Sequence, residues 1–522
     1  MKIELRSLRR ALLVGTASIA ALALLTSCGL SSSSNGTDSG PKKTDLVIGI
    51  GQLAPSADIH VDSASTSRNA LDNVYDRLVD PDFKGGWLPN VATEWSFNDD
   101  ITALTFTLRD DVSFTNGEKL DAAAVKYSLD RIMDPANKAY ALGTLSGKFS
   151  GAEVIDATHV KLLVKNNDVT AMSALAQLYL VPPVYSAKAG MGMGGEGIGS
   201  GPMMIKSFAP NDHLTLVPNP DYWGDNKVKL SAVTWLSIQD EAARSSALAS
   251  GRADVVFPLS PDIWEGLKKS KTVTTYSTTL GQYQNLFLGK TNQDTPLKDK
   301  RVRQAISHAI DTQSIADNVL RGTTEPISQL VEDGTDYFNS DLKPYAYDPA
   351  KAKELLSAAG YPNGFTIKME STAGRTPGDR EVAAAIVSML AKVGIVAQWT
   401  PLPASEWLTK FVTGTGAPLF MLNTSVEPAM MPESGLQQWT SGSFTKVFGD
   451  PVYDGMIADM LKIKDQKERA AALQKSSAYL LDAAPIAMLY KVPMLYGVSA
   501  NVKGFNANPD LSTDLSAITI TD

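Results

Sequence analysis

Apolar and polar residues alternate over several short segments of the chain, and each such segment predicts a β-strand. Residues 104–108 (LTFTL) alternate as a strand with one buried face does, and residues 160–164 (VKLLV) predict a second strand. Residues 46–50 (LVIGI) predict a short strand at which the ordered body of the protein begins. Asn116 and Gly117 follow residues 104–108 closely and predict a tight turn.

Apolar residues recur at helical spacing in two later segments, residues 302–310 and 382–390, so each segment predicts a helix with one buried face. Asp121 predicts the N-cap of an earlier helix, and Asp348, which a proline follows, predicts another helix start. Residues 395–399 (IVAQW) predict a strand directly after the second amphipathic helix. Strands and helices in alternation are typical of an α/β lobe.

Two stretches rich in proline or glycine predict loops. Residues 400–445 contain five prolines and predict a long irregular region, which in a compact fold is usually functional. Residues 190–201 are rich in glycine, and Gly190, Gly192 and Gly195 match the spacing G-x-G-x-x-G. A dinucleotide-binding fingerprint also needs a strand before it and a helix after it. Prolines flank this stretch instead, so it predicts a flexible loop.

The N-terminal segment has the layout of an export signal. Residues 6–10 hold three arginines, and residues 11–25 form an apolar run too short to span a bilayer comfortably. The tetrapeptide Leu-Thr-Ser-Cys ending at Cys28 resembles a bacterial lipobox, which implies cleavage before Cys28 and lipid attachment to it. Either general or twin-arginine export is compatible with the paired arginines. Residues 29–44 are small and polar and predict a flexible tether.

Composition narrows the function classes. The formal charge is −8, and it becomes −11 when residues 1–27 are removed, so no basic surface for nucleic acid is expected. Cys28 is the single cysteine, so neither disulfides nor a thiolate metal cluster can hold the fold together. The histidines are few and show no short-range ligand pair. We therefore expect a mildly acidic exported protein held by an apolar core, without cofactor or bound metal.

Four segments together resemble a known family, the family 5 extracellular solute-binding proteins of ABC importers, of the peptide- and nickel-binding type. Each segment is a weak signal, but the four follow one another in the order of the family and span nearly the whole mature chain. They are residues 73–95, 104–117, 199–224 and 301–311. Most of their polar residues, such as Arg109, Asn116 and Asn219, are expected to brace turns rather than to contact a solute.

The resemblance implies an α/β fold of the periplasmic-binding-protein type II, with two lobes and an extra α/β subdomain. It also implies a monomeric lipoprotein on the outer side of the cell membrane, without enzymatic activity, that delivers a small solute, first of all a peptide, to a permease and ATPase complex. The hinge would lie at residues 280–286 and 489–493. The expected boundaries are 1–27 for the signal, 28–44 for the tether, 45–65 with 200–280 and 488–522 for lobe I, 66–199 for the subdomain, and 281–487 for lobe II.

The predicted solute pocket combines the loop after the first strand, the first hinge crossing and the loop of lobe II. In relatives that bind peptides, backbone hydrogen bonds hold the ligand and an Asp-Pro pair often holds its amino group. In those relatives the pair lies in the lobe II loop; the corresponding loop of this chain has no Asp-Pro and offers Glu427 or Glu433 instead, which leaves a free peptide amine in question. The full set of predicted contacts is Gln52, Tyr283, Asn285, Asn423, Thr424, Glu427, Glu433 and Trp439.

Other readings of the sequence stay open. A nickel chelate, an oligosaccharide or an opine could be the solute of the same clamp, and a surface sensor could use the clamp without transport. A secreted hydrolase is a further alternative. The chain has no H-E-x-x-H or G-x-S-x-G motif, but its many acidic residues could include a glycosidase pair.

Overall fold

The computed structural model describes residues 44–61, 69–192, 196–289, 295–373, 375–425, 432–443, 448–506, 508 and 511–521. The predictions made for the signal, for Cys28 and for Glu427 lie outside these residues. Among the residues described, no helix has the length and apolar character needed to cross a membrane.

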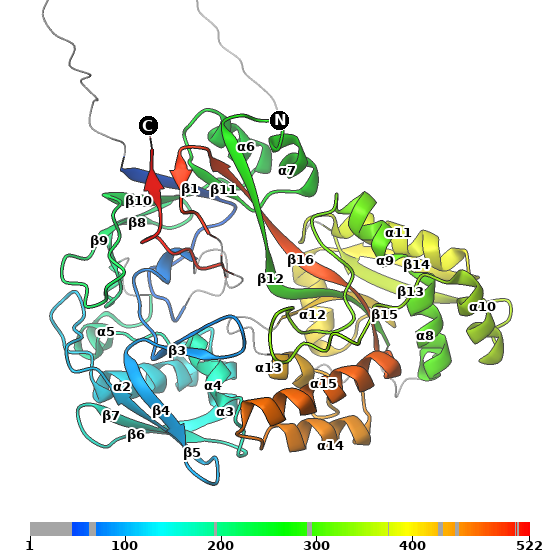
Figure 1. Ribbon diagram of the computed structural model, residues 1–522, viewed down its shortest axis with the longest axis horizontal. Coiled ribbons are helices and arrows are strands. Elements are labelled where there is room, and N and C mark those ends of the chain that lie inside the picture. Colours follow the sequence, from blue (N-terminus) through cyan, green and yellow to red (C-terminus); the bar gives the residue numbers. More distant parts are fainter. Residues whose placement is uncertain are drawn as a thin grey trace, which may run out of the picture. The chain divides into compact units, whose positions relative to one another are not determined.

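A ten-stranded mixed sheet organises the protein (Figure 1). Two long strands lie side by side at its centre, and each of them pairs on its other side with a shorter strand of one half of the sheet. In sheet order the strands are β14 (Ile395–Leu402), β13 (Phe365–Thr372), β15 (Leu419–Ser425), β12 (Val273–Leu288), β16 (Ile486–Ser499), β11 (Val255–Phe257), β1 (Asp45–Ile50), β10 (Ala232–Ser237), β9 (His213–Pro218) and β8 (Met203–Ala209).

Helices accompany both halves of this sheet. The half that contains β1 carries α6 (Glu241–Ala249), α7 (Pro261–Leu267) and the short strands β17 (Val502–Lys503) and β18 (Thr519–Ile520). Helices between β12 and β16 in the chain belong to the other half. They are α8 (Lys300–Ala309), α9 (Thr312–Ser314), α10 (Pro349–Ala358), α11 (Asp379–Ala391), α12 (Ala404–Thr413), α13 (Pro432–Gln437), α14 (Pro451–Met460) and α15 (Gln466–Ala483).

A second, smaller α/β unit lies between β1 and β8 in the chain (Figure 1). Its antiparallel sheet has the order β4 (Ala92–Phe97), β5 (Ala103–Leu108), β7 (His159–Val164) and β6 (Phe149–Val154). Its other elements are the hairpin of β2 (Val79–Pro81) and β3 (Trp87–Pro89) and the helices α2 (Ala122–Met133), α3 (Leu142–Lys148), α4 (Ala171–Ala174) and α5 (Pro183–Ala189).

Local sequence explains most of these elements. The strands predicted at residues 46–50, 104–108, 160–164 and 395–399 are present. Asp121 caps α2 by accepting hydrogen bonds from the backbone N–H groups of residues 123 and 124. Asp348 caps α10, and the stripe over residues 302–310 is buried in the core. These predictions are confirmed.

The prediction of an irregular region over residues 400–445 is wrong for much of it. The segment contains α12, β15 and α13, and β15 lies inside the large sheet between β13 and β12. Three of the prolines occupy places that need no backbone N–H. Pro403 precedes α12, Pro432 begins α13, and Pro401 lies in the edge strand β14.

Separate apolar cores stabilise the parts of the molecule. One lies around Trp235 and Tyr496 in the half that contains β1, and another lies around Phe106 and Leu129 in the smaller unit. The remaining half has two cores, one under α8 and α11 and one that contains Tyr283 and many aromatic residues. Burial of this kind contributes about 25 cal/mol per Å² of apolar surface.

Candidate functional site

The long strands β12 and β16 are irregular where they pass between the two halves of the sheet. Their pairing shifts between the Thr279↔Pro493 and Tyr283↔Lys491 positions, and again between Gln284 and Asn285. Gly281 lies in the first break with a φ of +60°, which favours glycine. Pro493 has no N–H to donate to the ladder. The crossing is thus a place where the backbone can bend without breaking regular pairs.

Three of the predicted solute contacts come together just beyond this break. Tyr283, Asn285 and Thr424 lie on the paired strands β12 and β15, and all three are buried. The Asn285 side-chain amide donates to the Tyr283 carbonyl and to the Thr424 hydroxyl oxygen, each at 2.9 Å. Asn285 Oδ1 is buried without a hydrogen-bond donor in the described part of the chain. Asn423, which pairs with Gln284, is half-buried.

An ion pair that sequence reasoning missed ties the two crossing strands together. The Tyr283 hydroxyl donates to Glu332 Oε1 at 3.0 Å, and Lys491 Nζ donates to Glu332 Oε2 at 2.9 Å. Tyr283 lies on β12 and Lys491 lies on β16, so the Glu332 carboxylate links the two strands. Burial, and then the Glu332 charge, raises the pKa of Tyr283. Lys491 is the one charged residue in the apolar strand β16. A charge in such a strand is rarely buried without a partner, so the sequence did contain a signal for an ion pair here.

A buried ion pair holds the loop after β1, in which Gln52 was predicted to contact solute. Gln52 itself is exposed. Six residues further on, Asp58 accepts hydrogen bonds from both Nη atoms of Arg131, at 2.5 and 3.2 Å. Arg131 lies on α2 and also donates to the Gly190 carbonyl at 3.0 Å. The pair therefore fixes the loop after β1 and the start of the glycine-rich stretch together.

His60 completes this buried group. Its Nδ1 lies 2.7 Å from Arg131 Nη1, and its Nε2 lies 2.9 Å from the carbonyl oxygen of Tyr179. Burial, and then the Arg131 charge, lowers the pKa of His60 to about 4, so the ring is neutral at pH 7. Burial raises the pKa of Asp58, but the hydrogen bond and charge of Arg131 outweigh burial and bring that pKa below its ordinary value.

Two further predicted solute contacts, the acidic residue Glu433 and the aromatic residue Trp439, lie on α13 and in the turn after it. Glu433 is 2% exposed, and its Oε1 accepts a hydrogen bond from Arg469 Nε at 3.0 Å. Trp439 is 1% exposed and packs on Phe287 with ring centroids 5.0 Å apart. These contacts give both residues a structural role, and a role in binding stays a prediction for them, as it does for Glu427.

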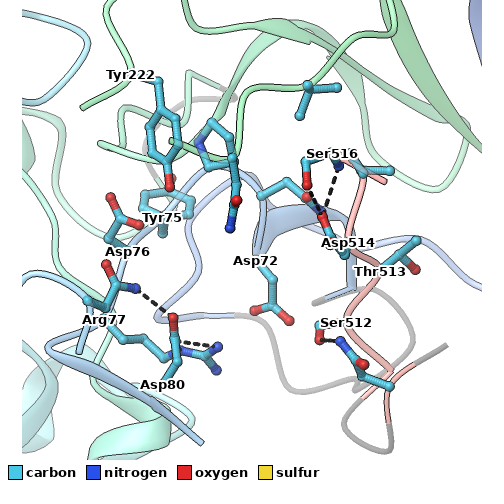
Figure 2. A pocket seen from close by; sticks show the side chains of 17 residues that line it. Asp72, Tyr75, Asp76, Arg77, Asp80, Tyr222, Ser512, Thr513, Asp514 and Ser516 are labelled. Carbon is cyan, nitrogen blue, oxygen red and sulfur yellow. Dashed lines mark hydrogen bonds and ion pairs between the residues drawn. The ribbon is translucent and has the colours of Figure 1, made fainter. Parts of the chain in front are cut away.

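An acidic cavity of about 220 Å³ lies elsewhere, between the smaller unit and residues 512–516 (Figure 2). Asp72, Asp76, Asp80 and Asp514 supply carboxylates to its lining, and Arg77 pairs with Asp80 at 2.9 Å. None of the predicted solute contacts in the described part of the chain lines this cavity. The cavity is therefore separate from the candidate site.

The polar residues that the sequence assigned to turns do brace turns. Arg109 pairs with Asp111 two residues later at 2.6 Å. The Asn219 amide donates to the Gly201 carbonyl, and its oxygen accepts from the Asp221 N–H. Asn116 accepts from the N–H of Glu118. In the part of the chain that the structure covers, no group of three or more His, Cys, Asp or Glu side chains is placed to hold a metal ion.

Comparison with known sequences identifies the family. Residues 87–446 match the family described as bacterial extracellular solute-binding proteins, family 5 Middle. The chain belongs to this family. The glutathione-binding proteins GsiB of Shigella dysenteriae and of Escherichia coli strain K12 are each 28% identical to the chain over 484 residues, which cover 89% of the chain and 92% of each relative.

Solved structures share the fold. The substrate-binding protein CtaP from Listeria monocytogenes superposes with a TM-score of 0.80 at 19% identity, covering 92% of this chain and all of that one. DppA from Helicobacter pylori, in complex with the peptide STSA, gives a TM-score of 0.74 at 23% identity, covering 92% and 98% of the two chains. The predicted α/β two-lobed type II fold is confirmed.

Membership of the family confirms the predicted role. This solute-binding protein is the substrate-binding part of an ABC importer, and its relatives are binding proteins rather than enzymes. The two halves of the large sheet are hereafter called lobe I, which contains β1, and lobe II, which contains β13 to β15. The smaller unit that contains β4 to β7 is called the subdomain.

Proposed function

We propose that this solute-binding protein captures a short peptide between its lobes and passes it to the permease and ATPase of its importer. The similarity to glutathione-binding proteins over 89% of the chain carries the proposal, because glutathione is itself a tripeptide. The solved relative DppA, bound to the peptide STSA, supports the same solute class. The protein is proposed to act as a monomer, anchored on the outer side of the membrane through lipid on Cys28.

Capture is proposed to proceed by hinge closure at residues 280–286 and 489–493. The register breaks of β12 and β16, with Gly281 and Pro493 at the first of them, support a bend at this place. The Tyr283–Glu332–Lys491 group keeps the two crossing strands together while they bend. A solute that contacts both lobes stabilises the closed state, since those contacts exist only there.

The domain boundaries are proposed as lobe I over 45–65, 200–280 and 488–522, the subdomain over 66–199, and lobe II over 281–487. The separate apolar cores support this division. In this division the proposed solute contacts come from three parts of the chain. Gln52 comes from lobe I, Tyr283 and Asn285 come from the crossing strand, and Asn423, Thr424, Glu427, Glu433 and Trp439 come from lobe II.

Purified protein is expected to bind glutathione or short peptides with micromolar or tighter affinity, about 8 kcal/mol of binding free energy or more. Isothermal titration with glutathione, a dipeptide set and a tetrapeptide set measures this directly. Mass spectrometry of solute that co-purifies with the protein gives an independent identification. Binding of a nickel chelate or an opine, with no heat from any peptide, would overturn the peptide proposal.

Glu427 or Glu433 is expected to hold the amino group of the peptide. Replacing that residue with glutamine should weaken peptide affinity by roughly tenfold to a hundredfold, because a hydrogen bond to a charged group contributes about 1.5–3 kcal/mol. Titration of both variants with a peptide and with its N-acetylated form separates them, since only the free amine needs the carboxylate. Glu94→Gln on the exposed face of β4 is the control. Unchanged affinity in both variants would contradict the idea of an acidic grip.

A further inference from the structure

The hairpin of β2 and β3 has a tightly built tip at residues 82–86, called here the latch loop. Asp82 Oδ1 accepts hydrogen bonds from the N–H groups of Lys84 and Gly86, at 2.7 and 2.8 Å. Phe83 has a φ of +57° and Gly85 has a φ of +96°. A positive φ is unusual for a bulky residue such as phenylalanine. The fold thus holds Phe83 in an unfavourable backbone conformation at the tip of the hairpin.

The latch loop belongs to the subdomain, but Phe83 and Gly85 in it pack on lobe II. Phe83 is half-buried against the aromatic core of lobe II that contains Tyr283 and Tyr337. Gly85 lies directly on the Tyr337 ring, because a Cβ at position 85 would come within 2.3 Å of that ring. The Tyr337 hydroxyl accepts a hydrogen bond from Arg469 at 3.2 Å, so the ring is held in place from the side of lobe II.

A second contact joins the same two parts of the molecule. The Val169 N–H donates to the Leu461 carbonyl at 3.0 Å, which is a backbone hydrogen bond between the subdomain and lobe II. Lys148 Nζ donates to Gln437 Oε1 at 3.1 Å while it pairs with Asp168 at 2.6 Å.

The subdomain and lobe II do not fill the space between the latch loop and this second contact. A cavity of about 360 Å³ lies there, lined by Trp87, Trp95 and Met172 of the subdomain and by Glu433, Lys464 and Arg469 of lobe II, among others. Packed interiors leave few voids larger than a water molecule. A partly filled interface with a few discrete contacts is suited to forming and separating again.

The subdomain is joined to lobe I by buried contacts. The buried Asp58–Arg131 pair joins the loop after β1 to α2, and Tyr179 of the subdomain is part of the lobe I core. Rotation of lobe II about the β12 and β16 crossing therefore carries it away from the latch loop. The contacts of Phe83 and Gly85 then exist in the closed form and are lost in the open form.

We propose that the latch loop is a solute-independent catch, which closes lobe II on the subdomain and sets how much of the empty protein is closed. This inference rests on the hinge closure proposed above. The catch consists of one half-buried ring and one close glycine contact, so it is weak enough to release. Apparent solute affinity scales with the fraction of protein in the closed form, so the catch tunes affinity without touching the solute.

Distance measurement between the subdomain and lobe II tests the catch. Spin labels are placed at Val184→Cys and Val452→Cys in the full chain with Cys28→Ser; these native side chains are 74% and 60% exposed. Double electron–electron resonance is recorded without solute. The parent is expected to be dominated by the distance found in this structure. Phe83→Ala and Gly85→Ala are each expected to raise the population at other distances at least threefold.

Gly117→Ala is the matched control for Gly85→Ala. Both glycines lie in subdomain turns at positive φ, +86° and +96°, but a Cβ at position 117 meets nothing within 4 Å. The control variant therefore shares the backbone strain and lacks the collision with Tyr337, and its distances are expected to match those of the parent. A parent already spread over other distances, or Phe83→Ala and Gly85→Ala distributions that superpose on the parent, would overturn the catch.

Titration with glutathione separates this inference from the proposed function. Heat of binding is measured on the same parent and variants, and the variants are expected to bind at least threefold more weakly. Absence of heat from the parent would reject glutathione as solute and leave the solute-free distance comparison intact. Equal affinity in parent and variants, with binding present, would count against the catch alone.

Discussion

Replacing Arg131 with methionine is expected to lower the free energy of unfolding by about 3–5 kcal/mol. Arg131 is 6% exposed and gives two hydrogen bonds to Asp58, which is fully buried. Methionine keeps the volume of the side-chain stem and removes the charge. The Asp58 carboxylate is then left buried with the N–H groups of His60 and Gly192 as donors but without a countercharge. An uncompensated buried charge is among the largest single destabilising effects known in proteins.

Equilibrium unfolding in urea, followed by circular dichroism, measures this loss. Lys126→Met is the control, since Lys126 lies on the same helix α2 and forms an exposed ion pair with Asp130. Exposed pairs of this kind contribute about 0.3–0.5 kcal/mol. Equal small losses in both variants would contradict the role assigned to the buried pair. Because Arg131 also fixes the loop that carries Gln52, weaker solute binding is expected to accompany the loss of stability.

The second large expected effect is a change in how the free energy of unfolding depends on pH. This change has opposite signs in the variants His60→Gln and Asp76→Asn. His60 has a pKa of about 4 in the folded protein against an ordinary value of 6.5. The unfolded chain therefore binds more protons between these values, and the His60 contribution to stability is complete above pH 6.5. It is lost as pH falls toward 4, by roughly 3 kcal/mol in total. Burial of the ring is the larger cause, and a proton on Nδ1 would in addition face Arg131 at 2.7 Å.

Asp76 acts in the opposite direction. It is 6% exposed, and burial raises its pKa to about 6 from an ordinary value of 3.8, although Ser200 and Trp223 both donate to Oδ2. Here the folded protein binds more protons, so the Asp76 contribution is most favourable below pH 3.8. It is lost as pH rises through 6, again by roughly 3 kcal/mol. In the wild-type protein the two residues largely offset each other between pH 6.5 and 4.

The variants His60→Gln and Asp76→Asn separate the two opposite dependences of the free energy of unfolding on pH. Relative to wild type, His60→Gln is expected to gain stability as pH falls from 6.5 to 4, and Asp76→Asn is expected to lose it. Urea unfolding at several pH values gives both differences, and carboxylates common to all three proteins cancel in the comparison. Curves that stay parallel to wild type would show that neither group has a shifted pKa in the folded state.

Some elements of the fold could be predicted from the sequence and others could not. The cap at Asp121, the helix start at Asp348 and the stripe over residues 302–310 were readable because each depends on neighbours within a few positions. The irregular region over residues 400–445 was misread because proline count alone does not say whether a proline lies at an element boundary. Its strand β15 owes its stability to β12 and β13 on either side, which no local pattern records.

The sequence by itself determined the family, the α/β class, and most strands and helices. These depend on short-range periodicity, on capping, and on family signatures that survive as strings of residues. Only the tertiary structure decided which polar groups meet. Asp58 and Arg131 are 73 positions apart, Tyr283 and Glu332 are 49 apart, and Gly85 meets Tyr337 across two parts of the molecule. Such pairs arise from folding of the whole chain, because their free energy comes from shared burial rather than from any sequence pattern.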